Sequence, residues 1–163
     1  VDALPAYINE KNVAMFSRHG VLTRDELEAR YNIHLENYCK VMTIEGNTLL
    51  DMTRRQILPA VSAFGAELCE RMWKKQQMGV SCGYETETAR AVSALTEELY
   101  AACGQLEADI AGIPADATEA MDYCHKNLVP AMAKARKAAD ELEELVPQTY
   151  WPMPDYCELL FDL

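Results

Sequence analysis

Apolar side chains recur at alternating three- and four-residue steps along most of this chain, which is the rhythm of amphipathic α-helices. The longest such run extends from Thr23 to Met78, and its only helix-breaking residues are Gly46, Pro59 and Gly65. Its apolar stripe comprises Leu27, Tyr31, Leu35, Tyr38, Met42, Leu49, Met52, Ile57, Val61, Phe64, Leu68 and Met72. A helix of this reach far exceeds the average of about 11–12 residues in globular proteins. The pattern therefore predicts the spine of a helical bundle.

The two ends and the interior of this run carry local signals. Thr23-Arg-Asp-Glu26 is a capping-box pattern, in which the glutamate reaches back to the first residue of the helix. Residues 79–83, Gly-Val-Ser-Cys-Gly, end the run. Because Pro59 removes one backbone hydrogen bond, we expect a kink near Ile57 or a break into two helices.

Three further helices are predicted, over residues 4–18, 87–111 and 117–146, the last bent at Pro130. The short connection at residues 112–116 favours antiparallel neighbours. No segment has a convincing strand pattern. The predicted fold class is all-α: an antiparallel helical bundle built on one very long helix, kinked or broken at Pro59, with a helix-free C-terminal tail rich in aromatic residues and proline.

Helix lengths indicate that part of the long helix lacks a partner. At about 1.5 Å per residue it would reach about 84 Å, whereas the two helices that follow span only about 38–45 Å. They can cover the half after Leu49 and leave residues 27–42 uncovered, unless the helix at residues 4–18 folds back. Otherwise a catalytic domain or another subunit must cover this apolar surface. Candidate interface residues are Leu27, Tyr31, Leu35 and Tyr38.

The C-terminal tail concentrates large apolar side chains between stiffening prolines. Its candidate docking residues are Trp151, Tyr156, Leu160 and Phe161, with Tyr150 beside them. A free end of this composition is poorly suited to water. It is expected either to pack on its own bundle or to dock into a neighbouring subunit as an anchor.

Charge and length exclude several classes of protein. Residues 1–84 hold 10 acidic and 10 basic side chains, whereas residues 85–163 hold 16 acidic and 5 basic ones, for a net charge of −11. Such an excess repels phosphate backbones, so nucleic-acid binding is not expected.

No apolar run approaches the ~18–20 residues that cross a bilayer. The chain begins at Val1 without a signal-peptide pattern, and we expect it to be cut from something longer.

The six cysteines form no Cys-x-x-Cys pair, and four of them, Cys39, Cys69, Cys103 and Cys124, lie within helical patterns. Without a secretory signal, the pattern favours reduced thiols that fill the core of a cytoplasmic protein.

Residues that could carry chemistry are few. His19, His34 and His125 are scattered and form no metal-ligand pair at helical spacing. Glu45 interrupts the apolar stripe, which makes it look buried; such a carboxylate could act as a base, but it more commonly pairs with an arginine across the bundle. There is no phosphate-binding loop, nucleophile motif or di-iron carboxylate repeat. The sequence thus offers no catalytic, cofactor-binding or metal-binding residue.

Five ordered segments complete the picture: residues 3–27, Leu35-Glu-Asn-Tyr38, Leu50-Asp-Met-Thr-Arg-Arg-Gln-Ile-Leu-Pro-Ala-Val61, Val129-Pro-Ala-Met132 with residues 138–143, and Tyr150-Trp-Pro-Met-Pro-Asp-Tyr156. Together they resemble the C-terminal region of type III glutamine synthetases. The resemblance is weak between about residues 70 and 118. It implies a parent enzyme that condenses glutamate and ammonia through a γ-glutamyl phosphate, using ATP and Mg2+ or Mn2+.

The resemblance also implies an organisation. The catalytic, nucleotide and metal residues of such an enzyme lie upstream, residues 1–20 are the end of the catalytic domain, residues 21–146 are a helical bundle domain, and residues 147–163 are a docking tail. Expected partners are the catalytic domain of the same chain and neighbouring subunits of a homo-oligomer with stacked rings. The fragment alone is expected to be inactive and to hold no cofactor.

The sequence therefore predicts a non-catalytic C-terminal helical domain of a type III glutamine synthetase, which serves subunit assembly or positions the catalytic core. Two alternatives remain open at this point. One is a free-standing helical adaptor that binds a partner helix along the stripe at residues 27–42. The other is a small helical-bundle enzyme.

Overall fold

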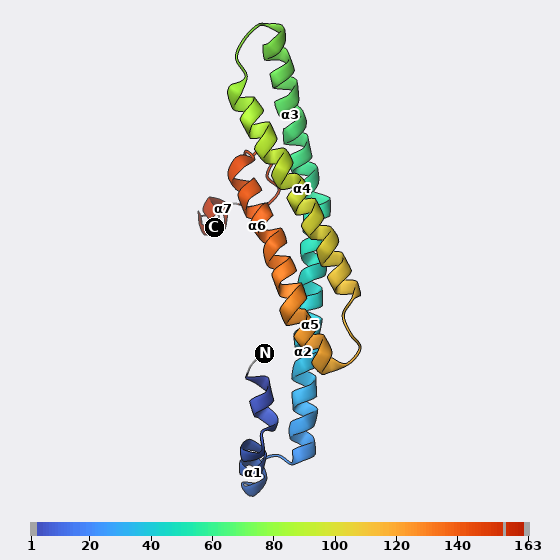
Figure 1. Cartoon of the computed structure of the whole chain (residues 1–163). Coiled ribbons are helices and arrows are strands. Elements are labelled where there is room, and N and C mark those ends of the chain that lie inside the picture. Colours follow the sequence, from blue (N-terminus) through green and yellow to red (C-terminus); the bar gives the residue numbers. More distant parts are fainter. Residues whose placement is uncertain (1–2, 155, 162–163) are drawn as a thin grey trace. The chain divides into compact units, whose positions relative to one another are not determined.

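The computed structural model describes residues 3–154 and 156–161, and it is 83% helical. No strand occurs in these ranges, and the helices pack against one another (Figure 1), which confirms the predicted all-α bundle. The helical segments are η1 (Leu4–Ile8), α1 (Glu10–Arg18), α2 (Arg24–Met52), η2 (Thr53–Ile57), α3 (Leu58–Gln77), α4 (Gly83–Ala111), α5 (Ala117–Tyr123), η3 (Cys124–Leu128), α6 (Val129–Leu145) and α7 (Tyr156–Phe161).

The predicted long helix is present and unbroken, since α2, η2 and α3 follow one another over 54 residues. Before Pro59 the backbone widens into a π-helical turn, in which the N–H of Leu58 donates to the carbonyl of Thr53. Pro130 follows an equivalent π turn, with the N–H of Val129 donating to the carbonyl of Cys124. Proline offers no N–H, and a local i→i+5 pattern lets the helix continue past it.

The start of the chain differs from the single helix predicted over residues 4–18. A short 3-10 helix (η1) ends before Asn9, whose extended backbone (φ −63°, ψ 139°) and side-chain oxygen cap α1 by accepting from the N–H of Lys11 at 3.1 Å. Asparagine is among the preferred N-cap residues, which explains the interruption. The capping box of the long helix is confirmed: the N–H of Thr23 donates to Glu26 at 2.8 Å, and the N–H of Glu26 donates to the Thr23 hydroxyl at 3.3 Å.

The chain forms two compact units, one of Val1–Asn47 with Ala108–Pro130 and the other of Thr48–Glu107 with Ala131–Leu163. Each unit has its own core, and each is described by itself below. The predicted roles of residues 1–20 and 147–163 relative to a catalytic domain stay predictions.

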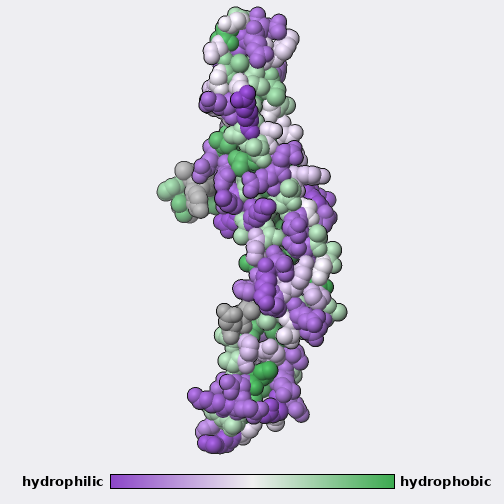
Figure 2. Space-filling model, viewed as in Figure 1, coloured by the Kyte–Doolittle hydropathy of each residue, from purple (hydrophilic) through white to green (hydrophobic). Residues whose placement is uncertain are grey.

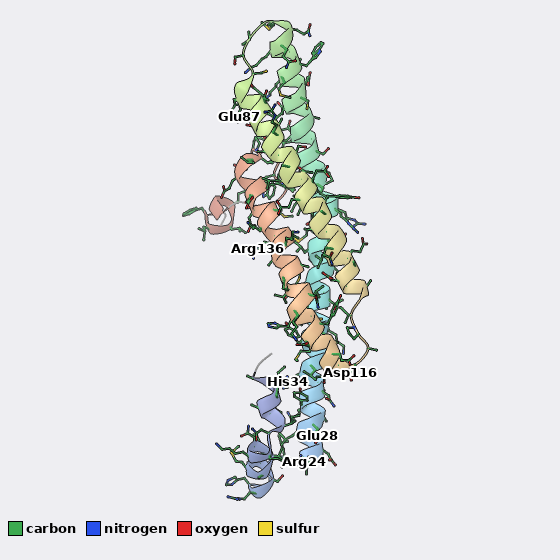
Figure 3. All side chains as sticks on the ribbon, viewed as in Figure 1. Arg24, Glu28, His34, Glu87, Asp116 and Arg136 are labelled. Carbon is green, nitrogen blue, oxygen red and sulfur yellow. The ribbon has the colours of Figure 1, made fainter. Side chains whose placement is uncertain are left out.

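In the first unit, the N-terminal helices fold back on the start of α2. The rings of Tyr7 and His34 meet edge to face with centroids 5.7 Å apart, and Arg24 pairs with Glu10 at 2.7 Å; Figure 3 labels Arg24 and His34 on α2. Cys124, the first residue of η3, is a neighbour of Cys39 on α2: burial, together with this nearby thiol, raises the pKa of Cys124 to about 11. The predicted third helix therefore reaches further back along the stripe than its length alone suggested.

In the second unit, α3 and α4 form an antiparallel hairpin, with α6 alongside (Figure 1). Ion pairs between Arg54 and Glu107 at 2.6 Å and between Lys75 and Glu85 at 2.5 Å tie the hairpin at both ends. Its buried core consists of Leu50, Ile57, Val61, Phe64, Leu68, Val92, Leu99, Cys103, Leu106, Ala135, Leu142 and Val146.

Two positions predicted to face the core are exposed instead: Glu45 and Cys69. For Glu45 the reason is clear, because the neighbouring Gly46 is buried and supplies the position that the apolar stripe seemed to skip. A glycine carries no apolar signal, so the carboxylate looked like an interruption of the stripe. Glu45 lies on the solvent side of α2 and is no candidate for a buried base.

Candidate docking surface

The described residues contain no cluster of metal-binding groups. Across residues 3–154 and 156–161, no three histidine, cysteine, aspartate or glutamate side chains come close enough to hold a metal ion. Cys39, Cys69, Cys82, Cys103 and Cys124 are free thiols. In the same part of the chain, no helix is both long and apolar enough to cross a membrane.

The segment after α6 begins by packing on its own bundle through Tyr150. Its ring lies against Phe64, with centroids 5.5 Å apart, and its hydroxyl donates a hydrogen bond to the carboxylate of Glu67. This hydrogen bond raises the pKa of Tyr150 and lowers the pKa of Glu67, because it favours the neutral phenol and the charged carboxylate. Tyr150 thus fixes the direction in which the chain leaves the bundle.

The end of the tail is a short helix, α7, rather than the helix-free segment that the sequence predicted. Its Leu160 and Phe161 are 68% and 77% exposed, and Leu159 is exposed as well. Figure 2 shows hydrophobic atoms projecting from the surface where Figure 1 places α7. The side chain of Tyr156 lies outside the described residues. Leu160 and Phe161 therefore keep the accessible position that a docking anchor requires.

Trp151 lies half-buried in the wall of a cavity of about 610 Å3. The cavity is lined by Leu49, Met52, Ile57, Arg136, Ala139, Asp140, Glu143, Glu144, Trp151, Met153, Pro154 and Leu159. All of these residues belong to the second unit, and Arg136 is labelled on α6 in Figure 3. Three separate segments of the chain build this cavity, so no local motif indicated it in the sequence.

The other predicted interface, the early stripe of α2, is only partly accessible. Leu27 and Leu35 are 0% exposed, which corrects their assignment to an open interface. Tyr7 of η1 and Glu10 of α1 contact His34 and Arg24 of this part of α2. Tyr31 and Tyr38 are half-buried, and their role in docking stays a prediction.

Two groups of exposed apolar residues were not selected from the sequence. Ile33 and Val41 are exposed on α2, eight residues apart and therefore on one side of the helix. Trp73, Met78, Val80 and Tyr84 are exposed around the turn between α3 and α4. The spacing of Ile33 and Val41 could have been recognised in the sequence, but the longer apolar stripe beside them on the same helix dominated the pattern.

Comparison with known proteins agrees with an all-helical module from the end of a larger enzyme. The family of the glutamine synthetase C-terminal domain matches residues 1–76. The chain is 31% identical over 166 residues to a glutamine synthetase of Butyrivibrio fibrisolvens, a match that covers 99% of this chain and 24% of that protein. It is 31% identical over 173 residues to the type-3 glutamine synthetase of Dictyostelium discoideum, covering 98% of this chain and 23% of that protein.

A glutamine synthetase of Bacteroides fragilis is 25% identical over 173 residues, again with 98% of this chain and 23% of the relative covered. The chain is thus similar over nearly its whole length to glutamine synthetases, and over residues 1–76 to the glutamine synthetase C-terminal domain. The resemblance to the type III enzymes that the sequence suggested is confirmed. The chain spans about a quarter of the length of the relatives it matches.

Proposed function

We propose that this chain is the non-catalytic C-terminal helical domain of a type III glutamine synthetase and that it serves subunit assembly or positions the catalytic core. The parent enzyme would join ammonia to glutamate at the expense of ATP, with Mg2+ or Mn2+, in the cytoplasm. Catalytic residues would lie in the larger part of the polypeptide. The match of residues 1–76 to the glutamine synthetase C-terminal domain supports this division of labour.

The observation that carries the assembly role is the exposed apolar end of α7. Leucine and phenylalanine side chains that protrude into water cost free energy, and contiguous exposed apolar groups typically mark an interaction site. Aromatic and large aliphatic anchors of this kind supply much of the binding energy of protein interfaces. The proposed partners are the catalytic domain of the same polypeptide and neighbouring subunits of a homo-oligomer.

The test is made on the complete polypeptide that carries this domain. Replacing Leu160 and Phe161 together by serine should shift the assembled enzyme to smaller species in mass photometry, because the anchor is lost while the bundle stays folded. Met78→Ser is a matched control, since Met78 is 78% exposed and lies at the far turn of the α3–α4 hairpin. An unchanged assembly mass in the Leu160/Phe161 variant would contradict the proposal.

The alternative of a free-standing adaptor has weaker support. It relied on an uncovered stripe at residues 27–42, and the two leucines of that stripe are buried by the chain itself. The 163-residue chain alone should form no glutamine from glutamate, ammonia and ATP; measurable turnover by the pure chain would overturn the non-catalytic assignment.

A further inference from the structure

The cavity beside Trp151 has an apolar floor. Leu49, Met52 and Ile57 enter it from the long helix, and Met153 closes it from the C-terminal segment. Its volume of about 610 Å3 falls within the range of roughly 300–1,000 Å3 that is usual for ligand pockets. A floor of this composition favours an occupant with a branched aliphatic side chain.

The rim of the cavity is acidic. Arg136 and Asp140 neutralise each other, with their nitrogen and oxygen atoms 3.5 Å apart. Glu143 and Glu144 also line the cavity, are exposed, and form no ion pair with another described residue. Two carboxylates on one side of an apolar opening favour an occupant that carries positive charge, since opposite charges steer and orient a partner.

Trp151 forms one wall of the cavity, and its side chain is half-buried. Its indole N–H is buried, so it does not open into the cavity, and the wall offers an occupant only the apolar part of the ring. A large aromatic ring adds apolar contact area for a side chain that fills the floor.

We infer that the cavity at Leu49, Trp151 and Glu143 binds a basic, leucine-containing segment of a neighbouring polypeptide. A leucine side chain of the segment fills the apolar floor against the ring of Trp151, and a lysine or arginine of the segment meets Glu143 and Glu144. The inference rests on the proposed function, because it names the chemistry of one segment that the assembly domain receives.

The test uses the 163-residue chain and a fluorescent peptide in which leucines alternate with lysines. Anisotropy titration should show saturable binding, and the same peptide with glutamate in place of lysine should not bind. Changing Glu143→Lys and Glu144→Lys together should weaken binding by roughly tenfold or more, since two attractive pairs become repulsive. Glu97→Lys with Glu98→Lys changes the net charge equally on α4 and is the matched control, which should bind normally.

A second variant tests the apolar wall. Trp151→Ala removes the ring from the wall of the cavity and should weaken binding by roughly tenfold or more, because large aromatic groups supply much of the binding energy of protein interfaces. Circular dichroism confirms that each variant is folded. The inference is overturned if the acidic peptide binds as well as the basic one, if neither binds, if both lysine pairs weaken binding equally, or if Trp151→Ala binds normally. Peptide binding and assembly mass are measured separately, so either proposal can fail without the other.

Discussion

Leu35 and Ile33 lie two residues apart on α2 but have opposite surroundings. Leu35 is 0% exposed in the core of its unit, whereas Ile33 is 53% exposed. We predict that Leu35→Ala destabilises the chain by about 3 kcal/mol, since buried leucine-to-alanine changes cost roughly 2.7–5 kcal/mol through lost burial and the cavity left behind. Ile33→Ala should cost well under about 1 kcal/mol, because little burial is lost and alanine is the better helix former.

Urea unfolding followed by circular dichroism at 222 nm measures both variants against the unchanged chain. For a chain of this size about 3 kcal/mol corresponds to a melting temperature roughly 6–12 °C lower. The comparison separates a stripe that the chain buries itself from a stripe held open for a partner. If Leu35→Ala proved no more costly than Ile33→Ala, the burial of Leu35 in the core would be refuted.

Three further predictions concern single contacts. Gly112→Ala places a Cβ only 2.8 Å from the Tyr123 hydroxyl oxygen and should displace that ring, so the raised pKa of Tyr123, due mainly to burial, should fall toward its ordinary value in an ultraviolet titration. Tyr150→Phe should raise the pKa of Glu67 in a carboxyl NMR titration, because the hydrogen bond from Tyr150 lowers that pKa in the folded state. The stability that Glu67 contributes is therefore present above its pKa in the unfolded chain, and it is lost as the pH falls through its pKa in the folded chain. Thr23→Ala should cost about 1 kcal/mol in urea unfolding by removing a helix cap.

The helices could be predicted well from the sequence because their signals are local. Apolar spacing marked the long helix to within a residue at each end, and the Thr23 capping box formed as expected. The two prolines were expected to break or bend the helices. The wider turns before Pro59 and Pro130 absorb the missing hydrogen bonds instead, and such turns have no clear residue signature.

What covers each apolar stripe could not be predicted, because periodicity shows that a face is buried but not by what. The N-terminal helices fold back on α2 through a turn with Gly20 in the left-handed region (φ 62°), and apolar spacing along α2 carries no signal for that fold-back. The burial of Gly46 could not be predicted either, because a glycine contributes no apolar side chain to the pattern.

Only part of the candidate docking surface could be predicted from the sequence. Composition alone pointed to Leu160 and Phe161 at the C-terminus, and both are exposed. The short helix α7, which carries both residues, follows Pro152 and Pro154 and was not predicted. The cavity beside Trp151 combines residues separated by about a hundred positions in sequence, so only a folded chain brings its floor and its acidic rim together.

The proposal that this bundle is one domain of a larger synthetase can be tested through the intact mass of the native polypeptide, captured from its source cells with an antibody raised against residues 1–163. We expect a polypeptide about four times the 18.3 kDa of this chain, since the chain covers about a quarter of its relatives. A native mass near 18.3 kDa would refute the proposal.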